Sequence, residues 1–287
     1  MNACPWLARS LAFVVLAALG TAPCAAHEFW AEPSTYRPDL GSELVVRLRV
    51  GDPPQHEEFP ASNRHRARFE LLGARALPIV PGPDKTPPAG RVQVDAPGLH
   101  WIVYRSHDSQ TTLAPDAFRR YLGEEGLERW TPHWTSWDPA QTTPVTEAFS
   151  RCVKALVHVG DAPGARHPCA PGFRRRAGLT LELVPLLNPL SVRPGGWLPF
   201  QLLLHGQPAP RRLVKAFRPD AAVPPQRAWT DACGVVRFRL PEAGAWLFSS
   251  VHLEPAPPGE AVRYRSVWTS LTFELRAARA TCRPGAR

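Results

Sequence analysis

Apolar and polar residues alternate along many short segments of this chain, and this alternation is the feature that most limits its fold. In residues 43–50, Val46 and Leu48 share one face of an extended strand, while Arg47 and Arg49 share the other. A period of two is that of a β-strand with one buried face. Other segments alternate in the same way: RARFELL, LHWIVYRS, KALVHVG, LTLELVP, WLPFQLLLHG, RLVKAFRP, GVVRFRL, AWLFSSVHLEP and SLTFEL. The sequence therefore predicts an all-β protein.

Proline and glycine separate these segments, as they do where strands are joined by short turns. The chain contains 34 prolines and 20 glycines. The alternation stops in residues 166–178, which are rich in Pro, Gly and Arg, and then begins again. This rhythm is typical of β-sandwiches of about a hundred residues. We therefore predict two tandem immunoglobulin-like β-sandwich domains, at residues 27–165 and 179–277, joined by a linker at 166–178 and followed by a tail at 278–287.

Residues 114–130 depart from the alternation. Pro115, followed by an aspartate, is a common way for a helix to begin. Phe118, Tyr121 and Leu122 then follow at helical spacing. This segment predicts a short helical insertion in the first domain.

Residues 1–26 have the pattern of a secretory signal peptide. Arg9 supplies a positive charge, LAFVVLAAL at 11–19 is a short apolar core, and Cys24-Ala25-Ala26 is a small-residue cleavage site. The apolar core is too short to span a bilayer as a helix, which requires about 20 residues. We expect cleavage before His27 and export to the periplasm. The alternative is a lipoprotein with a lipidated Cys24, but the three residues before it, Thr-Ala-Pro, lack the expected leucine.

The charge of the chain limits the partners of an exported protein. The formal net charge is +9, and removal of the leader, with its one arginine and no acidic residue, leaves +8. In an exported protein such a charge favours envelope polyanions or anionic membrane faces, and the expected export argues against nucleic acid as a partner. After the leader, no apolar run approaches the length of a membrane span, so no transmembrane segment is predicted in the mature chain.

Four cysteines remain after the leader: Cys152, Cys169, Cys233 and Cys282. An even number in an oxidising compartment favours disulfide bonds. Proximity in the sequence suggests the pairs Cys152–Cys169 and Cys233–Cys282, although the other connectivities stay open. No two of them have the spacing C-x-x-C, so neither a thioredoxin-like motif nor a zinc ribbon is present.

A set of motifs extends over nearly the whole chain after the leader. The segment HEFWAEP places His27, Phe29, Trp30 and Pro33 in an H-x-F-W-x-x-P pattern. Further motifs are RLRVGD, PGLHWIVYRS, FRRYLGEEGLE, SRCVKALVHVG, TDACGVVRFRLPEAGAWLFSSVHLEPAP and SVWTSLTFEL. Together they resemble an exported bacterial family catalogued as domain of unknown function family 4198, which is described as related to nickel or cobalt uptake.

The resemblance implies an exported two-domain β protein that works with a metal-uptake membrane system. It implies no established activity. Two segments depart from the family pattern, GDPPQHEEF at 51–59 and RWTPHWTSWDP at 129–139. Any role of the second segment is therefore expected to be particular to this protein.

An N-terminal His27 would offer two nitrogen ligands on one residue, its α-amine and its imidazole Nδ1. Both groups lose their protons near neutral pH, and together they close a six-membered chelate ring around a metal ion. One more imidazole would complete a nitrogen-rich set suited to Cu, Ni or Co. His252 and His107 are the candidates for this third ligand, because His252 lies in a family motif and His107 follows a predicted strand. The alternative for His252 is a structural histidine at a sheet edge.

Other chemistry finds less support in the sequence. No nucleophile-elbow, phosphate-loop or dinucleotide-binding motif is present, so no enzyme class is indicated. Glu124 and Glu125 are adjacent and are interpreted as a solvated helix face. Aromatic rings are concentrated in residues 129–139, at Trp130, His133, Trp134 and Trp137. Their two alternative roles are to bind an envelope glycan or to cover the junction between the domains.

Two functional hypotheses follow from these observations. The first is a periplasmic accessory protein that binds a transition-metal ion (Ni, Co or Cu) for uptake or homeostasis. The second is an envelope interaction or structural module that binds a protein or glycan without a metal. A copper-dependent oxidative enzyme is a weaker third, because no substrate surface is evident.

Overall fold

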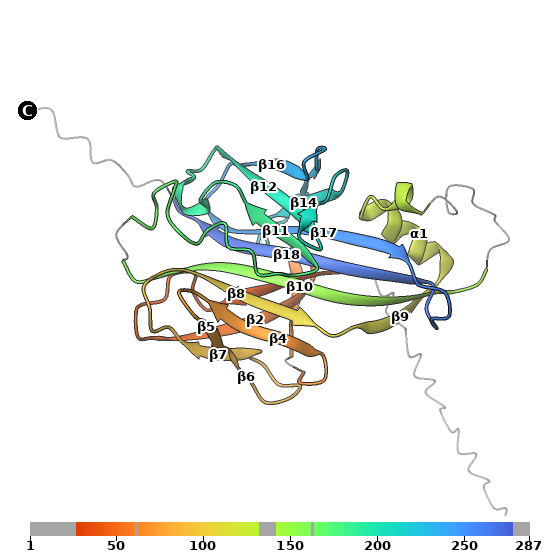
Figure 1. Ribbon diagram of the computed structural model, residues 1–287, viewed down its shortest axis with the longest axis horizontal. Coiled ribbons are helices and arrows are strands. Elements are labelled where there is room, and N and C mark those ends of the chain that lie inside the picture. The colour runs from red at the N-terminus through yellow and green to blue at the C-terminus, as the bar shows by residue number, and fades with distance from the viewer. Residues whose placement is uncertain (1–26, 61, 132–141, 162–163, 278–287) are drawn as a thin grey trace, which may run out of the picture.

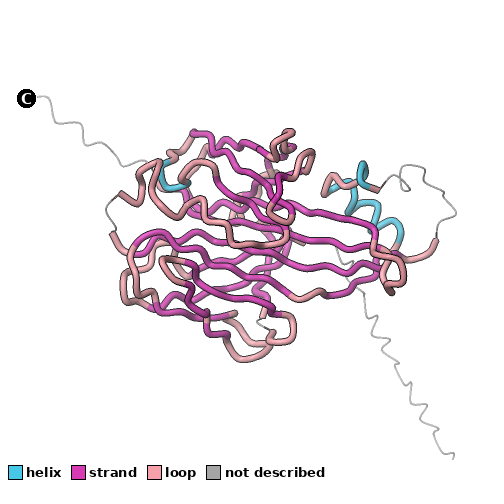
Figure 2. Tube along the Cα trace, in the orientation of Figure 1, coloured by secondary structure: helices cyan, strands magenta, loops and turns pink. Residues whose placement is uncertain are grey.

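The computed structural model describes residues 27–60, 62–131, 142–161 and 164–277, and it confirms that the protein is all-β with a single α-helix in these ranges. Its strands form three sheets stacked in layers (Figures 1 and 2). No helix in the described ranges is long and apolar enough to cross a membrane.

The largest sheet has nine strands and forms the middle layer. Its order is β15 (Gln226–Trp229), β14 (Leu213–Phe217), β17 (Gly244–Pro255), β18 (Tyr264–Leu275), β10 (Val145–Val159), β8 (Gly98–Ser106), β4 (Arg66–Leu72) and β5 (Ala76–Pro78), with β9 (Ser109–Leu113) also paired to β10. We call it the central sheet.

A smaller sheet covers each face of the central sheet. The first sheet contains β1 (Glu28–Pro33), β2 (Glu43–Asp52), β7 (Gly90–Gln93) and β6 (Val80–Pro81), and β3 (Gln55–Phe59) also pairs with β2. The third sheet contains β11 (Leu181–Pro185), β12 (Gly196–Leu204), β13 (Gln207–Pro208) and β16 (Val235–Leu240). The 3-10 helix η2 (Pro189–Ser191) connects β11 to β12.

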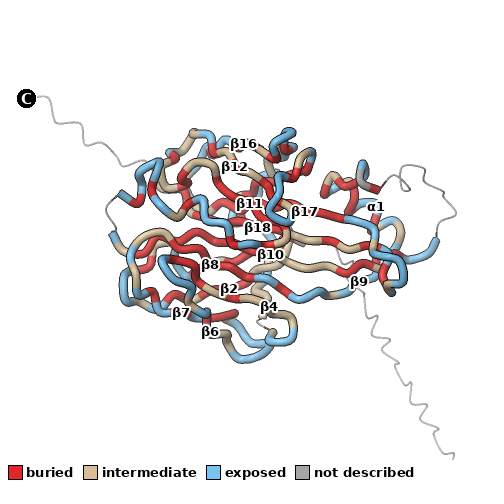
Figure 3. Tube along the Cα trace, viewed as in Figure 1, coloured by how far each residue is buried: buried red, intermediate tan, exposed pale blue. Residues whose placement is uncertain are grey.

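Alternation along β10 shows how the layers share the central sheet. Val153 and Ala155 belong to the apolar core beneath the first sheet, whereas Cys152 and Leu156 belong to the core beneath the third sheet. Figure 3 shows the buried segments gathered along this middle layer. The strand is therefore buried on both faces, and it needs a covering layer on each side.

The expected separation into two tandem sandwiches requires a correction, because one sheet crosses the predicted boundary. β10, from the first half, pairs in parallel with β18, from the second, with Glu147 opposite Tyr264 and Ala155 opposite Thr272. The physical reason is visible in residues 152–159, which are buried without interruption. A strand that is apolar on both faces forms the middle of a three-layer protein rather than the face of a separate sandwich.

The helix lies where the sequence predicts it. α1 (Pro115–Glu124) begins at the proline, and the 3-10 helix η1 (Glu128–Trp130) follows it. Phe118 stacks on Tyr264 and Tyr121 stacks on Trp268, with ring centroids 5.2 and 5.5 Å apart. Because these partners are on β18, α1 covers one end of the central sheet.

Candidate functional site

The first strand, β1, is an edge strand whose two faces pack against different parts of the central sheet. Phe29 and Ala31 lie in the core of the first sheet, while Trp30 packs with Phe217 and Leu247. The Thr272 hydroxyl donates a hydrogen bond of 2.8 Å to the Ala31 carbonyl oxygen. β1, an edge strand of the first sheet, is thus attached to the central sheet by apolar packing and by a hydrogen bond.

His27 precedes this strand at the exposed end of the β1–β2 pair. Antiparallel pairing sets Glu28 opposite Gly51, which brings His27 beside Asp52. The imidazole Nδ1 lies 3.1 Å from Asp52 Oδ2, and the two side chains are 40% and 64% exposed. An imidazole and a carboxylate therefore meet where solvent and ions have access.

Immediately inside this pair lies a buried cluster of three charges. The Lys215 ammonium is 2.6 Å from Glu28 Oε1 and 2.5 Å from Glu125 Oε1, and all three residues are buried. Burial raises the pKa of Glu125 to about 7, although Lys215 lowers it in part. Burial alone would lower the pKa of Lys215, but the two carboxylates raise it above its ordinary value. This ion-pair cluster ties β1 to β14 and to the end of α1.

The position of Glu125 corrects the expectation of a solvated helix face. Glu124 is exposed as expected, but Glu125 follows the last helical residue and turns toward Lys215 on β14. The side chain is buried because α1 ends against the central sheet, a long-range contact that helical spacing does not reveal.

Another buried carboxylate, Glu147, lies beneath α1. Its Oε1 accepts hydrogen bonds from Ser266 and, at 3.4 Å, from the Tyr121 hydroxyl. Its Oε2 is buried and has no hydrogen-bond partner among the described residues. Burial raises the pKa of Glu147 to about 7, and the two hydrogen bonds oppose this rise.

The two other histidines predicted as metal ligands lie elsewhere. His252 is buried on β17, on the same face of the central sheet as Phe248, and its Nε2 is 3.2 Å from Glu254 Oε2. Burial and the nearby Arg212 lower its pKa. His107 lies in the β8–β9 turn, where its backbone N–H donates to the His65 carbonyl oxygen.

The structure does not bring His27, His252 and His107 together. In the ranges that it describes, no three side chains of His, Cys, Asp or Glu are grouped so that they could hold a metal ion. Asp52 is the neighbour that the structure adds to His27, and sequence reasoning missed it because the contact depends on strand register.

The cysteines differ from the predicted pairing. Cys152 is a free, buried thiol in the core beneath the third sheet, and Cys169 is free and exposed. Burial raises the pKa of the Cys152 thiol. The expected Cys152–Cys169 bond is therefore absent, because β10 directs Cys152 into the core. Cys233 is exposed and forms no disulfide with another described cysteine, and Cys282, its predicted partner, lies outside the described residues.

Most of the aromatic tract lies beyond what the structure describes. His133, Trp134 and Trp137 are outside the described ranges, and Trp130 is the last residue of η1. Another aromatic contact lies near the N-terminal strand, where His56 on β3 has its ring edge-on to Trp30, with ring centroids 5.0 Å apart.

The buried ion-pair cluster had a signal in the sequence that the alternation pattern overlooked. Lys215 interrupts the apolar run LVKAF, and Lys154 interrupts CVKALV. A charged residue on a buried strand requires an opposite charge nearby. Lys154 has such a neighbour as well, Glu182 Oε1, at 2.8 Å.

Comparisons with known proteins place the chain by family and not by activity. A family model described as "Domain of unknown function (DUF4198)" matches residues 24–254. No curated protein matches. Among solved structures, dimeric latent PorU from Porphyromonas gingivalis matches with 12% identity and a TM-score of 0.19, over 87% of this chain and 20% of that one. This chain thus spans a fifth of that protein, and a likeness of this degree carries no argument about function.

Proposed function

We propose a function for this chain, which belongs to the family described as a domain of unknown function (DUF4198). The residues at the start of β1 support the proposal that it is an exported protein that binds a transition-metal ion. The proposed ion is Ni, Co or Cu, the proposed ligand is a processed N-terminal His27, and the proposed role is metal uptake or homeostasis in the periplasm. The observation that carries the proposal is the pairing of His27 Nδ1 with Asp52 Oδ2 at 3.1 Å in an exposed position.

The donor atoms available at this position fit such an ion. Cleavage before His27 would add an α-amine to the imidazole and the Asp52 carboxylate. Two nitrogens and one oxygen on a solvent-exposed site suit Cu(II) or Ni(II), which accept mixed N and O ligands. Asp52 thus takes the place of the third imidazole that the sequence suggests.

The surrounding structure supports a fixed position for these ligands. The next residue, Glu28, is buried and paired with Lys215, and Phe29 is buried in the core of the first sheet. Ligands carried by a rigid strand bind an ion with less loss of conformational freedom than ligands on a loop.

The test compares protein that begins at His27 with the same protein carrying one extra N-terminal residue. The extension turns the α-amine into an amide and breaks the chelate ring. We expect Cu(II) and Ni(II) affinity, measured by calorimetric titration, to fall at least about tenfold, which is about 1.4 kcal/mol. Equal affinities would reject the metal site and favour the alternative, an envelope module that binds a protein or glycan.

Substitutions then identify the third ligand. Asp52→Asn should weaken metal binding in the protein that begins at His27, whereas Asp39→Asn, at another exposed aspartate, should not. His252→Ala should leave the affinity unchanged, because His252 lies on the opposite face of the central sheet from the core that contains β1. If His252→Ala weakened metal binding and Asp52→Asn did not, His252 rather than Asp52 would be the third ligand.

A further inference from the structure

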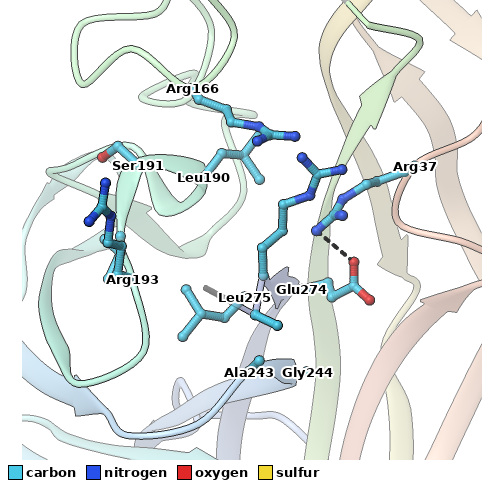
Figure 4. A pocket seen from close by; sticks show the side chains of 12 residues that line it. Arg37, Arg166, Leu190, Ser191, Arg193, Ala243, Gly244, Glu274 and Leu275 are labelled. Carbon is cyan, nitrogen blue, oxygen red and sulfur yellow. Dashed lines mark ion pairs between the residues drawn. The ribbon is translucent and has the colours of Figure 1, made fainter. Parts of the chain in front are cut away.

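A cavity of about 810 Å³ lies where the two halves of the chain meet, at the C-terminal end of β18 (Figure 4). Its walls come from segments far apart in the sequence: the chain after β1, the predicted linker, η2 and the segment after it, and the ends of β17 and β18. Cavities that hold organic ligands have volumes of roughly 300–1,000 Å³. The size alone therefore admits a small organic molecule.

The walls of this cavity carry a large excess of positive charge. Four arginines line it, Arg37, Arg166, Arg193 and Arg276, against one acidic residue, Glu274. Glu274 is engaged by Arg37, with an oxygen-to-nitrogen distance of 2.9 Å. Arg166 and Arg193 have no ion-pair partner among the described residues.

Arg37 and Arg166 are close enough to repel each other. Figure 4 shows the side chains of Arg37 and Arg166 extending toward the same region of the cavity. Burial lowers the pKa of Arg37, and the charge of Arg166 lowers it further. The buried His158 of β10 has its pKa lowered by burial and by these same two arginines. The one carboxylate that lines the cavity, that of Glu274, therefore does not neutralise the positive charge of the four arginines.

The remaining walls are partly apolar. Leu190, Val192 and Leu275 contribute aliphatic surface beside the guanidinium groups. Guanidinium groups bind carboxylate and phosphate through paired, charge-assisted hydrogen bonds. An apolar wall next to them accommodates the carbon framework of the same ligand.

We propose that this arginine-lined cavity binds a small organic anion, either a polycarboxylate or a phosphate ester. Arg166 and Arg193 would contact the anionic groups, and Leu190, Val192 and Leu275 would contact the carbon framework. A ligand seated there bridges the chain after β1 and the segment around η2. It would therefore stabilise the contact between the two halves.

The side chains of the sequence that follows Ala277 are cationic rather than anionic. The ten residues that follow Ala277 include three arginines and no aspartate or glutamate. A segment of this composition is repelled by a cationic cavity, whereas an external anion is attracted to it.

The experiment is a calorimetric titration of the metal-free protein with two probes, citrate as a polycarboxylate and glucose 6-phosphate as a phosphate ester, with glucose as the uncharged control. We expect at least one anion to bind with a Kd below about 1 mM, corresponding to about −4.1 kcal/mol, and glucose not to bind. The stronger probe identifies which anionic group the cavity prefers.

Variants show whether the binding occurs in the cavity. Arg166→Gln and Arg193→Gln should each weaken binding of the stronger probe at least tenfold. Arg120→Gln is the matched control, because Arg120 is an exposed arginine on α1, remote from this end of β18 in Figure 1. Circular dichroism verifies that each variant is folded. The proposal is overturned if neither anion binds, or if Arg120→Gln weakens binding as much as the two cavity variants do.

Discussion

Glu147 and Glu125 place ionisable carboxylates in an interior where charge is costly, and each has a different environment. Glu125 lies 2.5 Å from the Lys215 ammonium, which compensates its charge. Glu147 has only the hydroxyls of Ser266 and Tyr121 as hydrogen-bond donors among the described residues. An ionised carboxylate without a cation is disfavoured in such a place. Glu147 should therefore make the folded state sensitive to pH.

We expect Glu147 to lower the free energy of unfolding as pH rises. Its pKa in the folded protein is about 7, against 4.5 as the reference value. Between these values the folded state holds a proton that the unfolded state has released, so stability falls with rising pH. The slope cannot exceed about 1.4 kcal/mol per pH unit for one group.

Urea unfolding of the wild type and Glu147→Gln between pH 4.5 and 7 measures this contribution. The glutamine keeps an oxygen acceptor for Ser266 but does not titrate, so the wild type should lose more stability over this interval. Glu57→Gln, at an exposed glutamate, is the control and should follow the wild type. Parallel profiles for the wild type and Glu147→Gln would show that Glu147 does not cause the loss.

At the scale of elements, α1 depends on aromatic contacts rather than on its own helical stability. It has ten residues and no side-chain cap at its N-terminus. Isolated helices of this length are marginal in water. Phe118, Tyr121 and Leu122 are its buried residues, and the stacking on Tyr264 and Trp268 of β18 attaches it to the central sheet.

Phe118→Ala should therefore detach or loosen α1. Replacing a fully buried phenylalanine by alanine costs about 3–5 kcal/mol, and Phe118 is 0% exposed. Denaturant unfolding measures the loss, and hydrogen exchange of the backbone amides in 115–124 shows whether the helix opens. Arg120→Ala, on the exposed face, should change either quantity little. Similar stabilities for both variants would mean that α1 contributes little to the fold.

At the scale of the whole molecule, the parallel pairing of β10 with β18 makes the two halves interdependent. In a fragment limited to residues 27–165, the face of β10 that includes Cys152 and Leu156 would lose the third sheet that covers it. An exposed apolar face of this kind promotes aggregation. In the fragment 179–277, β18 would keep its neighbour β17 but lose its other neighbour, β10.

We accordingly expect the protein that begins at His27 to unfold in one cooperative transition. The separate fragments 27–165 and 179–277 should each fail to show a cooperative transition of their own. Differential scanning calorimetry and circular dichroism of the three proteins make the comparison. Two independent transitions, reproduced by the isolated fragments, would restore the description as tandem domains.

The strands and the helix could be predicted from the sequence because their signals are local. Alternation identifies β4 at Arg66–Leu72, and a proline marks the start of α1 at Pro115. His27 is a candidate ligand for the same kind of local reason, its place next to the predicted cleavage site. Such signals involve neighbours along one segment, so they survive without knowledge of the rest of the chain.

Only the tertiary structure decided which segments meet. The contact of His27 with Asp52 depends on the β1–β2 register, and the burial of Glu125 depends on where α1 ends against β14. The arginine-lined cavity joins Arg37 to Arg166 across more than a hundred residues. Alternation indicates that a strand has a buried face, but it does not indicate which strand lies beside it. Pairing is selected by packing over the whole molecule, and for this reason one sheet crosses the boundary that the sequence suggested.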